Sequence, residues 1–209
     1  MKKVFAIVAF VAAMFVAGNA QAQLSVNIGY APESIKTVID NSVSTENYQG
    51  FFAGVTYNIG LAKDLGVAIG PQLRLNTNSE TSSLYIPFVG TITGTSKSTQ
   101  LLIDVPVLFN YGISINRDFT VTPFIGPMLT LAATGKTKVT TNNTTNTYNW
   151  YGDNSSYSRF NLNGVGGVAL AYNQFKLFGG YRLGLLDLDS RNDYNVKTQG
   201  FFVGLGISF

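Results

Sequence analysis

The 209-residue chain contains no cysteine and no histidine, and only 12% of its residues are charged. Without cysteine and histidine, the chain cannot be a disulfide-stapled scaffold, a zinc finger or an enzyme with a histidine-dependent catalytic triad. An ordinary soluble domain carries roughly 25% charged residues, so about half of the usual charge is missing. No internal stretch reaches the roughly 18 uninterrupted apolar residues of a membrane helix, which excludes a helical membrane bundle.

The composition is rich in apolar residues instead, with 45% hydrophobic and 13% aromatic side chains and 22 glycines. Disordered chains have low hydrophobicity, so this composition argues for a folded protein. The formal net charge is +3, but no cluster of Lys and Arg is left once the N-terminal lysines are set aside. We therefore expect no nucleic-acid partner.

The N-terminal segment has the pattern of a secretion signal. Lys2 and Lys3 precede an apolar stretch over residues 4–17, and Ala20-Gln21-Ala22 fits the small-x-small cleavage rule. We predict a signal peptide over residues 1–22 and one mature domain over residues 23–209. A buried N-terminal helix or a single membrane anchor is the alternative.

The rest of the chain alternates between two kinds of side chain with a period of two, which is typical of strands with two different faces. At the C-terminal end the apolar positions are Phe201, Val203, Leu205, Ile207 and Phe209. Eight such strands are predicted, over residues 23–31, 48–59, 65–76, 98–114, 118–132, 159–172, 175–186 and 198–209.

The connections between these strands alternate in length. Short ones are expected over residues 60–64, 115–117 and 173–174, and long ones over residues 32–47, 77–97, 133–158 and 187–197. A soluble sandwich has no reason to place every long loop at one end, whereas a strand set threaded through a bilayer does. The third long loop is rich in Thr, Asn and Ser, and we expect it to be mobile or to extend its flanking hairpin.

The two faces of the strands differ in a way that favours lipid outside. One register is uniformly apolar and includes Val67, Ile103 and Leu183, whereas the other holds Arg74 and Asp104. A soluble interior would bury those charges at a cost of several kcal/mol per ion, and the reverse arrangement would expose a large apolar band to water. The sequence therefore predicts an all-β fold, an eight-stranded antiparallel up-and-down transmembrane β-barrel with short periplasmic turns and long extracellular loops.

Aromatic residues and prolines add two further expectations. Aromatics concentrate at the predicted strand ends, which favours interface girdles over a general preference of these residues for strands. The members near the short turns include Tyr57, Tyr111, Tyr172 and Phe175, and those near the long loops include Tyr30, Tyr48, Phe51, Phe160 and Phe201.

Bulges are expected at Pro71, Pro106, Pro123 and Pro127. The pattern Ile-Gly-Pro-x-Leu-x-Leu occurs at residues 69–75 and 125–131, which predicts one kink used twice.

Four segments resemble a known family. Residues 102–111 (LIDVPVLFNY), 122–127 (TPFIGP), 164–172 (GVGGVALAY) and 180–185 (GYRLGL) are similar to motifs of the small PorT-like/OmpA-like outer-membrane β-barrel family, the Bacteroidetes-type outer membrane protein β-barrel domain. The terminal register from Phe201 to Phe209 resembles the signal that the outer-membrane assembly machinery recognises. The resemblance implies an outer-membrane location and assigns no activity.

Eight strands enclose an interior that side chains can fill. Bulky residues of the inward register predict a plugged lumen: Phe52, Leu102, Leu108, Phe124, Met128, Phe178 and Phe202. Arg74 and Asp104 lie on neighbouring predicted strands at similar heights, with Arg182 close by. We interpret them as a structural ion pair that neutralises buried charge, in preference to a proton or ion path.

No catalytic, cofactor-binding or metal site is predicted. Asp187, Asp189 and Asp193 form an acidic loop, but a calcium loop would need a turn glycine and a bidentate Glu. Outer-membrane barrel enzymes such as lipid A deacylases, palmitoyltransferases and omptin proteases rely on histidine, so we expect no enzyme and no cofactor.

Two functional classes remain, and a third is less favoured. The first is a structural or surface-interaction barrel acting through its long loops, and the second is a conduit for small or apolar molecules. The third is a soluble lipocalin-like carrier. The expected partners are outer-membrane lipids and lipopolysaccharide, the assembly machinery, and a surface macromolecule at the loops. The sequence specifies neither a ligand nor an oligomeric state.

Overall fold

A computed structural model of the chain describes residues 23–39, 42–86, 90–141, 144–151, 157–189, 191 and 194–209. The predicted signal peptide, residues 1–22, lies outside the described residues. Within the described residues, no helix has the length and apolar character needed to cross a membrane.

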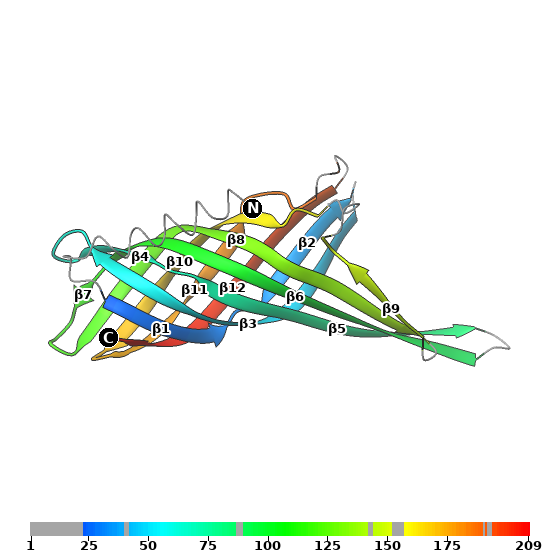
Figure 1. The fold of residues 1–209 in the computed structure, drawn as a ribbon, viewed down its shortest axis with the longest axis horizontal. Helices are drawn as coiled ribbons and strands as arrows, with labels where there is room; N and C mark the ends of the chain where they lie inside the picture. The colour runs from blue at the N-terminus through cyan, green and yellow to red at the C-terminus, as the bar shows by residue number, and fades with distance from the viewer. Residues whose placement is uncertain are drawn as a thin grey trace.

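In the part of the chain that the structure describes, twelve strands form a single antiparallel sheet (Figure 1). Their bounds are β1 Gln23–Tyr30, β2 Glu33–Ile39, β3 Ser42–Gly60, β4 Leu65–Ile69, β5 Gln72–Ile86, β6 Gly90–Tyr111, β7 Ile113–Ser114, β8 Phe119–Thr141, β9 Thr144–Asn149, β10 Phe160–Tyr172, β11 Phe175–Gly184 and β12 Tyr194–Ser208.

The strand pairings return to the strand from which they start. From β3 they run through β1, β12, β11, β10, β8, β6 and β5, and β5 pairs again with β3. β2 continues the position of β1 between β12 and β3, and β4 occupies the position of β5 between β3 and β6. The sheet therefore encloses an interior, and each strand of this circuit has a partner on both sides.

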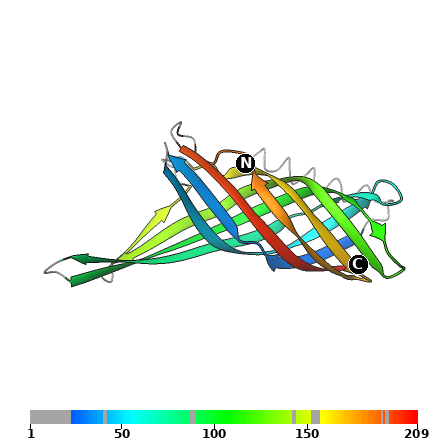
Figure 2. The ribbon, with the colours of Figure 1, turned by 180° about the vertical axis from the view of Figure 1, so that it is seen from behind.

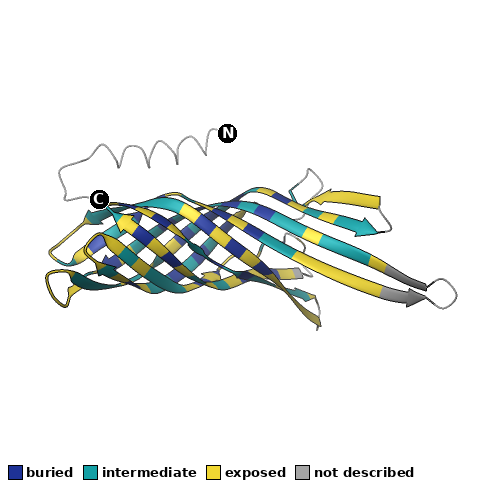
Figure 3. Ribbon diagram, turned by 90° about the horizontal axis from the view of Figure 1, so that it is seen from below, coloured by how far each residue is buried: buried dark blue, intermediate teal, exposed yellow. Residues whose placement is uncertain are grey.

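Burial alternates along much of the sheet, for example along β1, β10 and residues 100–106 of β6, with dark and light positions following one another in Figure 3. Leu183 and Leu205 are 49% and 59% exposed, whereas Arg74 and Asp104 are 1% and 2% exposed. Val67 and Ile103 share the outward register and are half-buried between their neighbours. The apolar register thus faces outward and the polar register faces the interior, which confirms the predicted orientation of the two faces.

The described residues form twelve strands where the sequence predicts eight: β2 and β9 arise from predicted loop sequence, whereas β4 and β7 arise because two predicted strands are interrupted. β2 and β3 continue to Ile39 and Ser42, and β5 and β6 pair as far as Ile86 and Gly90. The hairpin of β5 and β6 reaches furthest from the rest of the sheet, as both opposite views show (Figures 1 and 2). These segments are rich in Thr, whose branched Cβ favours extended backbone. The predicted bounds of the long loops at residues 32–47 and 77–97 are therefore wrong. The third long loop forms the β8–β9 hairpin, which confirms its expected role as an extension.

The repeated Gly-Pro pattern forms the same interruption twice. At Gly70-Pro71 the ladder with β3 stops and resumes in the same register, and at Gly126-Pro127 the ladder with β6 does the same. A Cβ at Gly70 would overlap the backbone oxygen of Val55, and one at Gly126 would overlap that of Val107. Only glycine permits this approach of two backbones.

The expected bulges at two other prolines are not present. Pro106 pairs in register with Met128, and Pro123 pairs with Val168. The register shift between β6 and β8 lies between Leu101 and Leu102 instead, opposite Ala132 and Thr134. At this point β8 contains one residue more than β6, so the β6–β8 ladder is interrupted here and not at either proline.

The close approach at Gly126 gives a first prediction. Gly126→Ala should lower the free energy of unfolding by about 1–3 kcal/mol, because the added methyl group must displace the backbone of β6. Urea titration of the refolded protein in detergent micelles, followed by tryptophan fluorescence, measures the loss. Gly60→Ala is the matched control, since a Cβ there meets nothing within 4 Å. Equal stability of the two variants would contradict this account.

Candidate functional site in the interior

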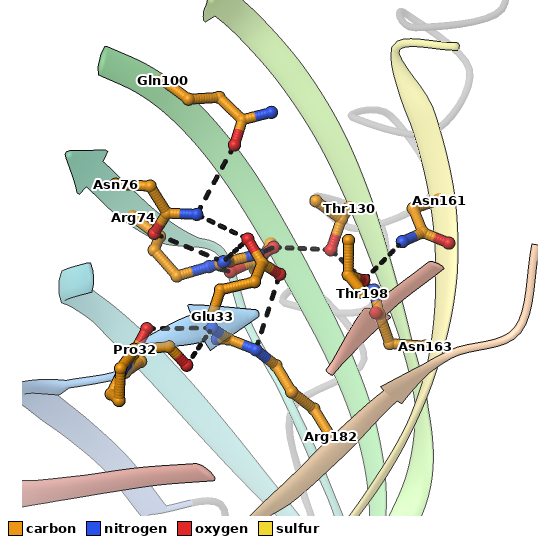
Figure 4. Close-up of polar contacts among 12 residues, drawn as sticks. Pro32, Glu33, Arg74, Asn76, Gln100, Thr130, Asn161, Asn163, Arg182 and Thr198 are labelled. Carbon is orange, nitrogen blue, oxygen red and sulfur yellow. Dashed lines mark hydrogen bonds and ion pairs between the residues drawn. The ribbon is translucent and has the colours of Figure 1, made fainter. Parts of the chain in front are cut away.

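Four charged side chains from four strands meet in the interior, and Figure 4 shows Glu33, Arg74 and Arg182 among them. Arg74 of β5 lies between two carboxylates: its Nε is 2.7 Å from Oδ2 of Asp104 on β6, and its Nη1 is 2.9 Å from Oε2 of Glu33 on β2. The side chains of all three residues are at most 4% exposed. The planar guanidinium can donate to both acceptors at once, which a lysine ammonium would do less well.

Arg182 of β11 completes the group. Its Nε lies 3.8 Å from Oε1 of Glu33, and its Nη2 donates to the backbone oxygens of Ala31 and Pro32 at 2.9 and 3.1 Å. Two guanidinium groups therefore face two carboxylates. The cluster is formally neutral, which limits the cost of holding four charges away from water.

Hydroxyl and amide side chains surround this charge cluster, which we define as Glu33, Arg74, Asp104 and Arg182. Thr130 donates to Oδ1 of Asp104 at 2.6 Å and in turn accepts from Asn163 at 2.9 Å. Asn76 donates to Oε2 of Glu33 at 2.5 Å. Both carboxylates thus receive hydrogen bonds in addition to their ion pairs, as buried charges require.

The structure brings the predicted partners Arg74 and Asp104 together, and Arg182 lies beside them. Arg182 forms its ion pair with Glu33, however, and the sequence analysis missed Glu33 because it placed this residue in a loop. The period of two could have identified Glu33, because the inward register of β1 continues past Pro32 through Gly29, Ala31 and Glu33.

Four phenylalanines form a layer beside the charge cluster. Each one pairs across the ladder with a glycine and lies over it: Phe52 with Gly29, Phe124 with Gly167, Phe178 with Gly204, and Phe202 with Gly180. Neighbouring ring centroids are 6.1–6.4 Å apart. The glycines leave room for the rings in an interior that is too narrow for two large side chains at one level. The predicted inward position of these rings is confirmed, as is that of the buried Leu102 and Met128.

A cavity of about 450 Å³ extends from this layer to the short turns. Its lining includes Lys63 and Asp64 in the β3–β4 turn at one end, and Arg74 and Asp104 at the other. Its walls carry amides and hydroxyls, among them Ser25, Asn27, Thr56, Asn58, Asn110 and Thr122. The ammonium group of Lys176 also lines it, 5.4 Å from the ring centroid of Phe178.

On the other side of the charge cluster lies a group of aromatic residues from the β9–β10 connection and β3. Gln100 donates to the hydroxyl of Tyr151 at 2.5 Å, and the Trp150 ring packs edge-on against Tyr48, with ring centroids 6.0 Å apart. Burial raises the pKa of Tyr151, so its hydroxyl stays protonated and can act as a donor. Tyr48 is 2% exposed, and its predicted place in an outer aromatic girdle is therefore wrong.

The other predicted interface aromatics face outward. Tyr111, Tyr172 and Phe175 are 50–58% exposed, and Tyr57 is half-buried. The residues of the predicted assembly signal share the outward register of β12 and its end: Phe201, Val203, Leu205, Ile207 and Phe209. Their exposure is compatible with recognition by an assembly factor, and that role stays a prediction.

In the acidic loop, the carboxylates of Asp187 and Asp189 bind other groups of the protein itself. Asp187 accepts hydrogen bonds from the backbone N–H of Val196 and the side chain of Asn195, and Asp189 pairs with Arg191 at 2.6 Å. Hydrogen bonds from Arg191 lower the pKa of Asp189. Asp193 lies outside the described residues, and among those described no group of three or more His, Cys, Asp or Glu could hold a metal ion.

Residues 11–190 match the model of a protein family described as outer membrane protein beta-barrel domain, and the chain belongs to this family. The class of protein that the closed sheet and its outward apolar face define is therefore an outer-membrane β-barrel protein. Its location is the outer membrane.

Solved structures with low sequence identity resemble the chain in part. The attachment invasion locus protein Ail of Yersinia pestis, solved with the heparin analogue sucrose octasulfate, has 18% identity and a TM-score of 0.48, covering 90% of this chain and 99% of its own. Neisserial surface protein A has 15% identity and a TM-score of 0.42, covering 89% and 97%. The N-terminal β-barrel domain of Pseudomonas aeruginosa OprF has 11% identity and a TM-score of 0.36, covering 90% and 100%. No curated protein sequence matches the chain.

The charge cluster gives a second prediction. Arg74→Leu should cost about 3–5 kcal/mol of unfolding free energy, because it leaves two buried carboxylates facing Arg182 alone. Combining it with Asp104→Leu removes one charge of each sign and leaves the neutral pair of Glu33 and Arg182. The double variant should therefore be more stable than Arg74→Leu alone. Urea unfolding measures both, and losses that simply add would contradict the coupling.

Proposed function

We propose that the chain forms an eight-stranded up-and-down barrel that spans the outer membrane, with its short turns in the periplasm and its hairpins outside. The pairing circuit of eight strands supports this arrangement, with β2 and β4 as continuations of β1 and β5. The outward apolar register of β6 runs from Tyr111 to Leu101, which is ten residue steps or about 33 Å of strand. A tilt of about 40° reduces this length to about 25 Å across the membrane, the height of the apolar band in such barrels.

The interior of this barrel is closed to solutes. The observation that carries this proposal is the charge cluster, which joins β2, β5, β6 and β11 with side chains that are almost fully buried. The phenylalanine layer lies beside it. A hydrated ion that has entered the cavity past these rings would have to separate two guanidinium–carboxylate pairs in order to pass.

With a closed interior, the role of the protein is structural or lies in contacts of its outer hairpins. The β2–β3, β5–β6 and β8–β9 hairpins present hydroxyl and amide side chains to the outside, including Thr81, Ser83, Thr93, Thr144 and Asn146. Such a surface fits recognition of a surface macromolecule. The role proposed here is binding or structural and not catalytic.

A conduit for small molecules is the second candidate, and the cavity of about 450 Å³ favours it. A volume of this size accommodates a small ligand. The cavity ends at Arg74, Asp104 and Arg182, so transport would require the charge cluster to open.

Planar-bilayer recording distinguishes the two candidates and gives a third prediction. The wild-type protein should give no reproducible conductance steps, whereas Arg74→Ser combined with Asp104→Ser should give steps, because water can then replace the central ion pair. Heat-modifiable gel mobility verifies that both proteins are folded. Regular steps of similar size in the wild-type protein would refute the closed interior and support the conduit.

A further inference from the structure

Apart from Lys176, which lies in the interior, the charged residues of the described strands are divided between the two faces by chemical type. Every described strand carboxylate and arginine lies on the inward register: Glu33, Glu46, Arg74, Glu80, Asp104 and Arg182. The charged residues on the outward register of the described strands are all lysines, and all five are exposed: Lys36, Lys97, Lys136, Lys138 and Lys197. We call these five residues the lysine band.

The lysine band lies just beyond the apolar register at the hairpin end. On β6, Lys97 comes four residues before Leu101, and on β12, Lys197 comes four residues before Phe201. Four residues span about 13 Å of strand, or about 10 Å along the membrane normal at a tilt of about 40°. This height is that of lipid headgroups, and the long lysine side chain can reach back toward the apolar boundary.

Pairing within the band brings like charges together. Lys97 is directly opposite Lys138, with Lys136 two residues away on the same face, and Lys36 is directly opposite Lys197. Side chains that are directly opposite have Cβ atoms about 5 Å apart, and like charges at that distance repel. Within the described residues, none of these lysines forms a salt bridge. An anion between each pair would convert the repulsion into attraction.

The paired lysines form two groups, Lys97, Lys136 and Lys138 in one and Lys36 and Lys197 in the other, and these groups lie on opposite sides of the pairing circuit. One spans β6 and β8, and the other spans β2 and β12, with β11 and β10 between them on one side and β5 and β3 on the other. Each group therefore faces a different part of the surrounding lipid.

We propose that the lysine band forms two binding sites for the phosphate groups of a bis-phosphorylated glycolipid in the outer leaflet. Lys97, Lys136 and Lys138 form the first site, and Lys36 and Lys197 form the second. The absence of carboxylates from the outward register of the described strands matches the charge of such a headgroup. Continuity with the apolar register favours a lipid over a soluble polyanion, because acyl chains and phosphates would then contact one surface. This inference rests on the proposed membrane orientation and adds a specific ligand class to it.

Native mass spectrometry of protein released from vesicles tests the proposal. The vesicles contain phosphatidylcholine with either bis-phosphorylated lipid A or phosphatidylglycerol at equal total charge. Wild-type protein should retain up to two molecules of the bis-phosphorylated lipid and little phosphatidylglycerol. Lys97→Ser combined with Lys138→Ser should reduce retention at least twofold, and adding Lys36→Ser and Lys197→Ser should abolish it. Lys63→Ser, in a turn at the other end of the barrel, is the matched control and should behave as wild type.

Three results would overturn the proposal: equal retention of both lipids, an equal loss in Lys63→Ser, or full displacement of the glycolipid by soluble dextran sulfate. The last result would assign the lysines to a soluble polyanion. Heat-modifiable mobility is measured on each sample. If the wild-type protein does not fold into the vesicles, the proposed membrane orientation fails. If it folds and shows no lipid preference, only the lysine sites fail.

Discussion

Backbone hydrogen bonding in a medium without water is the constraint on which the rest of this structure depends. In hydrocarbon, an unpaired N–H or C=O costs several kcal/mol, so a sheet can cross a membrane only if it has no free edge. The pairings of this chain return from β5 to β3 and meet that condition. Once the sheet is closed, the period of two along each strand divides the side chains into one set facing lipid and one facing inward.

That division explains why the interior contains arrangements that would be costly elsewhere. Charged side chains that cannot face the acyl chains gather inside, where Glu33, Arg74, Asp104 and Arg182 neutralise one another. Large rings fit the same narrow space because each lies over a glycine of the neighbouring strand, as Phe52 does over Gly29. Lysine is the charged residue that remains on the outside of the strands, beyond the apolar register.

The sequence predicted the features that follow from local periodicity. It placed the two faces correctly, identified Arg74 and Asp104 as partners, and recognised the repeated Gly-Pro interruption. It failed where periodicity continues past a residue that usually ends a strand: Pro32 led to Glu33 being assigned to a loop, although Glu33 binds both arginines. The hairpin extensions were also missed, because Thr and Ser are frequent both in loops and at exposed strand positions. The burial of Tyr48 depends on Trp150, a contact between distant segments that single-sequence patterns do not report.

Whether the apolar register faces lipid can be measured directly with nitroxide labels. Because the chain has no cysteine, a single introduced cysteine carries the label at each chosen position. Labels placed one at a time from residue 201 to residue 208 in vesicle-reconstituted protein would be compared for collisions with oxygen, which concentrates in the membrane, and with a water-soluble nickel complex. The account predicts high oxygen accessibility at residues 201, 203, 205 and 207 and low oxygen accessibility at the four positions between them. Uniform accessibility along the strand, or the opposite phase, would contradict it.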